Sequence, residues 1–221
     1  MGRDNQPKHR QQRQLKRKVE TRKAHDRILI VTEGLKTEPN YFGEMRVTYR
    51  LQSANIVIEP SRLGTEPSQI VEYARTLFTE GDYQLRIAPG AFDKVYVIFD
   101  RDEHRTYFDA LGQAEGLNNK LKNDERKMIS FEAVVSVPCF ELWLLLHFED
   151  IQAPLHRHDA LCQLKNHIPD YDKGAEGIFN LTSNKLEIAI ERAQILADAN
   201  SQHQDQPYSD IHKLIKELMS L

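Results

Sequence analysis

The sequence VYVIFDRDEH, residues 95–104, joins two patterns that suit opposite environments. Its first five residues are all β-branched or aromatic, which predicts a strand buried inside a sheet. Acids follow at positions 100, 102 and 103, where such a strand would leave the sheet, and His104 comes next. From this stretch alone two interpretations are open, a solvated turn and a site for a metal ion.

Working outward, apolar runs that predict strands alternate with stretches that predict helices. Alternation of this kind is typical of an α/β protein with a mostly parallel sheet flanked by helices. Beyond residue 148 the strand pattern stops, and a helical C-terminal portion is expected. The predicted strands, about four, cover 28–31, 56–58, 95–99 and 131–137; the predicted helices start near 37 and at 67 and cover 106–122, 155–168, 182–199 and 208–220.

The charge of the chain is unevenly distributed. Residues 1–27 carry ten Lys or Arg against three acids, a net charge of +7, which leaves −10 for the rest of a chain whose net charge is −3. A segment with so few apolar side chains cannot bury a core, so residues 1–26 are predicted to form a basic flexible arm. Contact with nucleic acid phosphates, contact with an acidic protein and a purely solubilising tail all fit this composition.

Composition also narrows the compartment. Two cysteines among 221 residues make no disulfide framework, which fits a reducing cytosol. The longest apolar run, residues 142–146, is far shorter than a membrane span. No apolar segment stands behind the N-terminal charges, so no secretory signal is expected. A cytoplasmic protein without a membrane partner is predicted.

Acids follow two of the predicted strands directly. Glu33 comes after residues 28–32, and Asp100 with Asp102 after residues 95–99. Ligands of an open parallel sheet bind beyond the carboxyl ends of its strands, and residues two apart in an extended segment point to one side. If the first and third strands are neighbours, three carboxylates meet, and their repulsion favours a bound cation such as Mg²⁺ or Mn²⁺. The alternative is a capped turn, in which Asp100 accepts hydrogen bonds from backbone N–H groups.

A third acid-bearing segment is PCFELWLLLHF, residues 138–148. It is apolar around nearly its whole helical circumference, which predicts a buried helix. Glu141 lies in the first turn, immediately beyond the fourth predicted strand, where the helix dipole favours a carboxylate. A buried charge needs a partner. A metal ion or a lysine would make Glu141 a site residue, whereas backbone amides or an arginine would make it structural.

Three stretches together resemble the RloB-like family: EGLKTEPNYF (33–42), VIFDRDEH (97–104) and PCFELWLLLHFED (138–150). YDKG (171–174) and AIERA (189–193) are similar too, and the likeness covers roughly residues 26–220. The resemblance implies a core like the Toprim (Rossmann-like) fold of topoisomerases, primases and OLD-type nucleases. In that fold a Glu after the first strand and a D-x-D after a later strand bind Mg²⁺. The family is associated with bacterial phage-defence and restriction loci, often beside an ATPase.

Carried onto this chain, the resemblance predicts a Toprim-like α/β core over residues 27–150 and a helical portion over residues 151–221 that packs on it. The expected metal ligands are Glu33, Asp100 and Asp102, with Glu33 as ligand or general base. Glu141 is expected as an additional catalytic carboxylate from its position in the PCFELW segment, because the Toprim comparison does not settle its role. Lys36, His104 and Lys173 are the expected substrate-binding residues. His104 stands where many Toprim enzymes carry a third acid. It could bind a metal ion, orient a phosphate, act as a general acid or only cap the next helix.

The function implied is a Mg²⁺- or Mn²⁺-dependent nuclease that hydrolyses phosphodiester bonds as an effector of phage defence or abortive infection. Nucleic acid and an ATPase are the expected partners. A rival interpretation is a non-catalytic module that uses the same fold to bind nucleic acid, a nucleotide or the ATPase. A phosphatase of small substrates is a second rival, but the chain lacks the D-x-D-x-T sequence that would favour it.

Overall fold

The computed structural model of the chain describes residues 25–52, 55–101, 104–203 and 206–221. Asp102, one of the predicted metal ligands, lies outside these ranges, as does the predicted arm up to residue 24. None of the helices within the described ranges is long and apolar enough to cross a membrane.

Five strands form one sheet in the order β2-β1-β3-β4-β5. The first four pair in parallel, and β5 pairs antiparallel with β4. This arrangement confirms the α/β class and the mostly parallel sheet, and it makes the first and third strands neighbours. The strands are β1 (Ile28–Thr32), β2 (Ile56–Pro60), β3 (Lys94–Asp100), β4 (Ser130–Val137) and β5 (Tyr208–Ser209).

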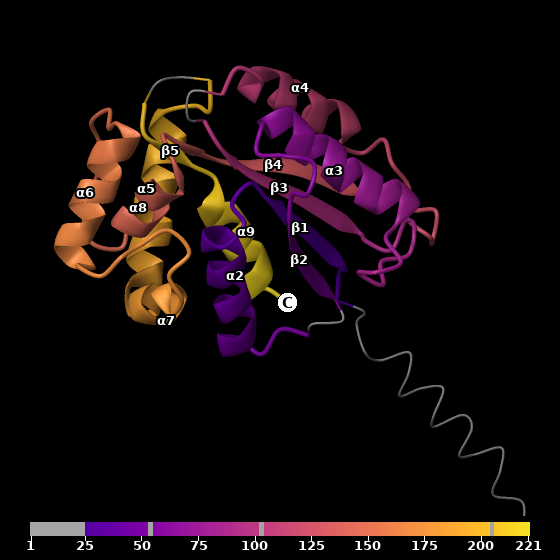
Figure 1. The fold of residues 1–221 in the computed structure, drawn as a ribbon, viewed down its shortest axis with the longest axis horizontal. Coiled ribbons are helices and arrows are strands. Elements are labelled where there is room, and N and C mark those ends of the chain that lie inside the picture. Colours follow the sequence, from indigo (N-terminus) through magenta and orange to yellow (C-terminus); the bar gives the residue numbers. More distant parts are fainter. Residues whose placement is uncertain (1–24, 53–54, 102–103, 204–205) are drawn as a thin grey trace, which may run out of the picture.

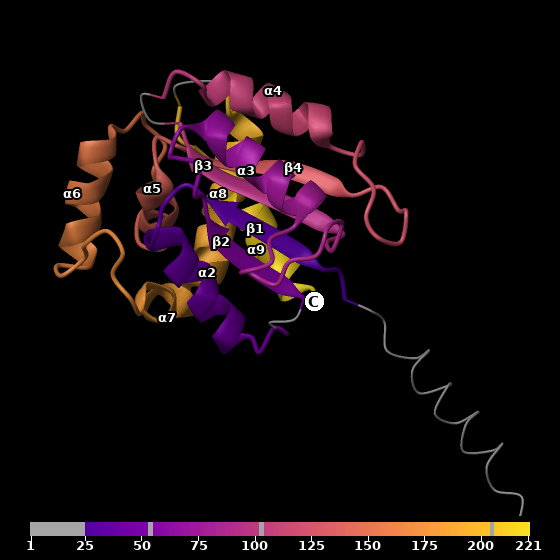
Figure 2. The same cartoon turned by 45° about the vertical axis from the view of Figure 1, so that its right-hand side comes forward.

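Helices cover both faces of the sheet, which explains why its central strands are apolar without alternation. Leu29 and Val31 of β1 face a core cluster that includes α3 and α4, whereas Ile28 and Ile30 face a cluster that includes α2, α5, α8 and α9 (Figures 1 and 2). The helices are α2 (Thr37–Thr48), α3 (Pro67–Glu80), α4 (Tyr107–Leu117), α5 (Phe140–Leu145), α6 (Arg157–His167), α7 (Ile178–Thr182), the 3₁₀ helix η1 (Ser183–Lys185), α8 (Leu186–Ala199) and α9 (Ile211–Met219).

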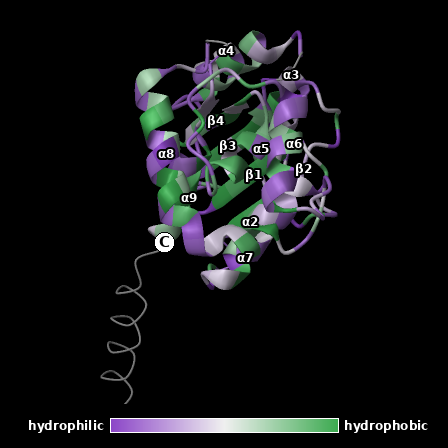
Figure 3. Cartoon of the chain, turned by 90° about the vertical axis from the view of Figure 1, so that its left-hand side faces the viewer, coloured by the Kyte–Doolittle hydropathy of each residue, from purple (hydrophilic) through white to green (hydrophobic). Residues whose placement is uncertain are grey.

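Hydropathy follows these layers. The central strands β1 and β3 and the helix α5 are apolar, and the outer helices carry polar residues on their surfaces (Figure 3). All six residues of α5 are buried, so the prediction of a buried helix after the fourth strand is confirmed. The side chain of Trp143 in α5 is among the largest that are fully buried.

The C-terminal portion departs from the prediction in two respects. Residues 208 and 209 form β5 instead of starting a helix, and they pair with Val137 and Ser136 at the edge of the sheet. A two-residue strand has no periodicity that a sequence pattern could reveal. The helix predicted over 182–199 is also divided, into η1 and α8. The domain boundaries at residues 26 and 150 stay predictions.

Candidate active site

The candidate site lies where β1 and β3 end beside each other. Glu33 follows β1, and its backbone N–H donates to the carbonyl of Ile98 in β3 at 2.9 Å. Its carboxylate reaches across the edge of the sheet, where Oε2 accepts the backbone N–H of Asp100 at 3.0 Å. The parallel pairing of β1 with β3 therefore brings these two predicted site residues together.

Asp100 is the last residue of β3 and is only 8% exposed. Burial raises the pKa of its carboxyl well above the usual range, and the negative charges of Glu33, Glu38 and Glu141 raise it further. The backbone N–H of Phe140, at the start of α5, opposes this rise because it stabilises the charged form. That contact is of the kind expected for a capped turn, but the three surrounding acids are not.

Glu38 is a member of the site that no strand-end argument predicted. It lies in the first turn of α2 on the buried stripe that it shares with Tyr41, Phe42 and Met45, and it is 5% exposed. Burial first, and then Glu33 and Glu141, raise the pKa of Glu38 to about 7. A side chain at Gly34 would have its Cβ 2.0 Å from Oε2 of Glu38, so glycine there leaves room for the acid.

Glu141 occupies the first turn of α5 and is 2% exposed. Two of its contacts come from the C-terminal portion, 30 or more residues away in sequence. The hydroxyl of Tyr171 donates to Oε1 at 3.3 Å, and Nζ of Lys173 lies 3.7 Å from the same oxygen. Glu141 thus contacts a tyrosine hydroxyl and a lysine, and its role in the site stays a prediction.

These four acids, Glu33, Glu38, Asp100 and Glu141, are called the carboxylate cluster below. All four line one cavity of about 340 Å³. Three cationic side chains line the same cavity: Lys36, Arg157 and Lys173. The cavity therefore combines buried negative charge with positive charge from separate elements.

The loop that carries Lys173 is fastened to α2. The backbone N–H of Gly174 donates to the hydroxyl of Thr37 at 2.9 Å, and the side-chain amide of Asn40 donates to the carbonyl of Gly174 at 3.0 Å. Gly174 has φ +85°, and a Cβ there would lie 2.8 Å from that of Lys36. Glycine thus allows the loop and Lys36 to approach closely at the mouth of the cavity.

His104 stands at the other rim of the cluster, and both of its ring nitrogens face carboxylates. Nε2 lies 3.3 Å from Glu33 and Nδ1 lies 3.4 Å from Glu66. Glu66 is itself held by the hydroxyl of Thr106, which donates to it at 2.8 Å. These contacts indicate a role that the sequence did not predict for His104, orientation of a site carboxylate.

The donor chemistry of the cluster suits a hard divalent cation, because oxygen ligands and excess negative charge favour Mg²⁺ or Mn²⁺. Within residues 25–52, 55–101, 104–203 and 206–221, however, no group of three or more His, Cys, Asp or Glu side chains is arranged to hold a metal ion. The predicted ligand Asp102 lies outside those ranges. The cluster thus fits a cation by charge and ligand type, with Glu33 and Asp100 already in contact.

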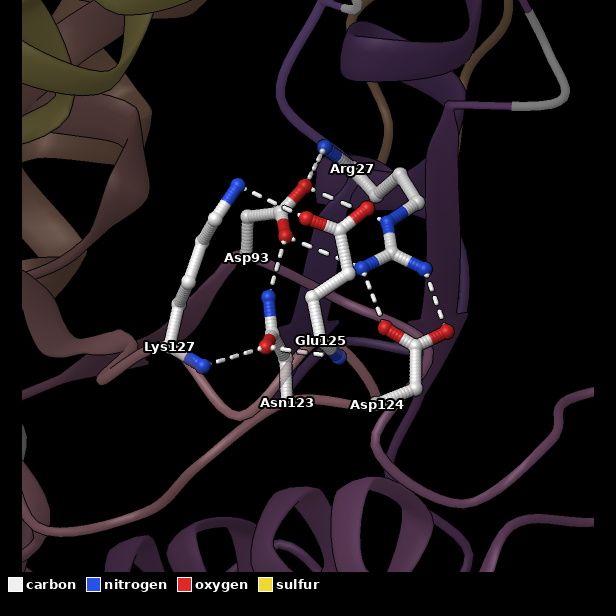
Figure 4. Close-up of polar contacts among 6 residues, drawn as sticks. All are labelled: Arg27, Asp93, Asn123, Asp124, Glu125 and Lys127. Atoms are coloured by element: carbon white, nitrogen blue, oxygen red, sulfur yellow. Dashed lines mark hydrogen bonds and ion pairs between the residues drawn. The ribbon is translucent and has the colours of Figure 1, made fainter.

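A larger cavity, of about 960 Å³, lies at the amino ends of β1, β3 and β4. Arg27 donates to both Asp93 and Asp124, Asn123 donates to Asp93, and Lys127 pairs with Glu125 (Figure 4). Each of these acids has a cationic partner within 3.0 Å. We assign this cavity a structural role at the entry to β1.

Comparison with protein families gives one match. The family model described as RloB-like protein matches residues 28–218. The chain belongs to the RloB-like family. Neither the curated proteins nor the solved structures gave a match. The RloB-like match spans the sheet and the C-terminal helices, so Glu33 and Lys173 both lie inside it, whereas the basic arm lies outside.

Proposed function

We propose that this RloB-like protein is a divalent-metal-dependent hydrolase of phosphodiester bonds in nucleic acid, with a Toprim-related core. The observation that carries the proposal is the burial of Asp100 among three further acids at the carboxyl ends of parallel strands. Like charges brought together in a buried place are costly unless a cation offsets them. Carboxyl groups in a cleft whose pKa values are strongly shifted are typical of functional sites.

The proposed roles follow from position. Glu33 and Asp100, with Asp102, would hold the metal ion, and Glu141 would add a further carboxylate. When bound, Mg²⁺ or Mn²⁺ would supply Lewis-acid polarisation of the phosphate. Lys36 and Lys173, at the cavity mouth, would attract and orient the phosphate.

Glu33 is also suited to accept a proton. It lies at the rim of the cavity, where Nε2 of His104 is 3.3 Å from its Oε1. Glu66 holds the opposite ring nitrogen, so His104 would fix the orientation of the Glu33 carboxylate. We assign His104 a positioning role in the reaction, whether Glu33 acts as metal ligand or as general base.

The cellular role and the partner rest on the family. RloB-like resemblance supports an effector of bacterial phage defence or abortive infection that works with an ATPase. The basic arm, with its excess of Lys and Arg, supports a polyanionic substrate.

Asp100→Asn tests the catalytic proposal, with Asp159→Asn on the exposed first turn of α6 as the matched control. Wild type is expected to melt higher in millimolar Mn²⁺ than in EDTA, because an ion that binds only the folded state stabilises it. At one hundred times the dissociation constant the gain is about 2.7 kcal/mol, or roughly 5–10 °C for a chain of this size. Asp100→Asn should lose this gain and all cleavage of DNA and RNA, while melting no lower than wild type in EDTA.

A non-catalytic binding module is the second candidate. It is favoured by the absence, among the described side chains, of a preformed group of three metal ligands. This candidate predicts that wild type and Asp100→Asn melt alike in EDTA and in Mn²⁺ and that neither cleaves nucleic acid. That pattern would reject the hydrolase.

A further inference from the structure

A row of rings runs from the core to the surface on the side of β3 that faces α3 and α4. The rings of Phe99 and Tyr107 meet edge to face at 5.8 Å, and those of Tyr107 and Phe108 do so at 5.2 Å. Phe108 then stacks nearly parallel with His203, with 6.0 Å between ring centres and 11° between planes. The hydroxyl of Tyr107 donates to the carbonyl of Gln202 at 3.0 Å, which holds the loop with His203 beside α4.

Arg101 joins this row from the end of β3. Its guanidinium carbon lies 5.1 Å from the ring centre of Phe108 and 5.6 Å from that of Tyr107. Arg101 directly follows Asp100, and neighbouring residues of an extended chain point to opposite sides. Asp100 therefore faces the carboxylate cluster while Arg101 faces α4. We call Arg101, Phe108 and His203 the stacking platform.

Packing alone does not account for the platform. Tyr107 is 1% exposed and already fills the core between β3 and α4, whereas Phe108 leaves 51% of its surface exposed. Single exposed apolar residues are common on protein surfaces. Here the exposed ring is accompanied by a cation and an imidazole, and it begins next to a residue of the carboxylate cluster. Aromatic rings and guanidinium planes are the groups on which nucleobases stack.

We propose that the stacking platform binds an unpaired nucleobase of the nucleic acid strand whose phosphate would bind at the carboxylate cluster. The inference rests on the proposed function, and it narrows the substrate class to single-stranded nucleic acid or unpaired ends. Bases within a duplex have both faces covered by their neighbours, so they offer no face to the stacking platform. Stacking uses the π-face that every base has, so little preference among the four bases is expected.

The test measures binding without catalysis. Fluorescence anisotropy in EDTA follows a labelled single-stranded oligonucleotide and an abasic strand of the same length. Phe108→Leu should weaken binding of the intact strand about 5- to 100-fold and leave binding of the abasic strand nearly unchanged. Phe108→Trp should retain the affinity, and His203→Ala should lose part of it. Tyr83→Leu, which removes a ring that is 98% exposed outside the platform, should change neither.

Equal effects of Phe108→Leu on the two strands, or no effect on either, would overturn the platform. Asp100→Asn separates this outcome from failure of the hydrolase. If Asp100→Asn still cleaves while Phe108→Leu loses base-dependent binding, the assignment of the metal site fails and the platform stands. If Asp100→Asn abolishes cleavage while Phe108→Leu binds the intact strand normally, the platform fails and the hydrolase stands.

Discussion

The charge state of Glu38 gives a direct test of the carboxylate cluster. Burial and neighbouring acids raise its pKa from 4.5 to about 7. Between these values the folded protein keeps a proton that the unfolded chain has released, so the free energy of unfolding falls as pH rises from about 4.5 to 7. A difference of about 2.5 pH units corresponds to about 3 kcal/mol at 1.36 kcal/mol for each unit. Glu38→Gln removes the titrating group and should remove this loss.

Urea denaturation in EDTA at pH 5 and pH 8 measures the effect. Relative to wild type, Glu38→Gln should gain about 3 kcal/mol of unfolding free energy between the two pH values. Asp100, whose pKa is raised by the same surroundings, should leave a residual decline in the variant. Glu80→Gln, on the exposed end of α3, should follow wild type. Parallel curves for Glu38→Gln and wild type would refute the buried, repelled carboxyl.

Two further predictions concern the other end of the sheet and the arm. Arg27→Ala should lower the free energy of unfolding by about 2 kcal/mol, because Arg27 makes paired hydrogen bonds to the partly exposed acids Asp93 and Asp124. As a control, Arg75→Ala breaks the exposed ion pair with Glu72 and should lower the free energy of unfolding by less than about 1 kcal/mol in the same thermal melts. Deleting residues 1–25 should leave the melting temperature nearly unchanged. The deletion should also make the logarithm of the nucleic acid binding constant depend less steeply on the logarithm of the salt concentration. An unchanged slope would show that the arm makes no phosphate contacts.

The sheet was predictable because its central strands are buried on both faces. Residues 28–32 and 95–99 are continuous apolar runs, which predict buried strands even when the neighbouring strands are unknown. Glu33 and Asp100 come directly after these runs in the sequence, so their positions at the strand ends were predictable too. The contact between Glu33 and Asp100 also requires that the first and third strands be neighbours, and the sequence did not determine the strand order. In the structure β1 pairs with β3, so the two strands are neighbours.

Glu38 was not predicted, because it lies in the first turn of a helix and follows no strand directly. Positions 38, 41, 42 and 45 follow the spacing of one helical face, so an acid stood on an otherwise apolar stripe. That conflict was visible in the sequence and is a signal of a functional carboxylate. The contacts of Tyr171 and Lys173 with Glu141 had no comparable signal, because they join segments whose approach depends on the packing of the whole C-terminal portion.

The C-terminal portion therefore contributes charge to the site, through Lys173, as well as packing against the sheet. Burial of Asp100 beside three acids destabilises the charged form, and the cationic side chain of Lys173 approaches Glu141. Lys173 is 45% exposed, so solvent screens its charge, and it offsets only part of the repulsion. The negative charges of Glu33, Glu38 and Glu141 still repel that of Asp100, which is one of the proposed ligands of the metal ion. The loop of residues 171–174 both lowers this cost and contributes Lys173 and Gly174 to the cavity, so the proposed binding of an anionic substrate would depend on the packing of the C-terminal helices.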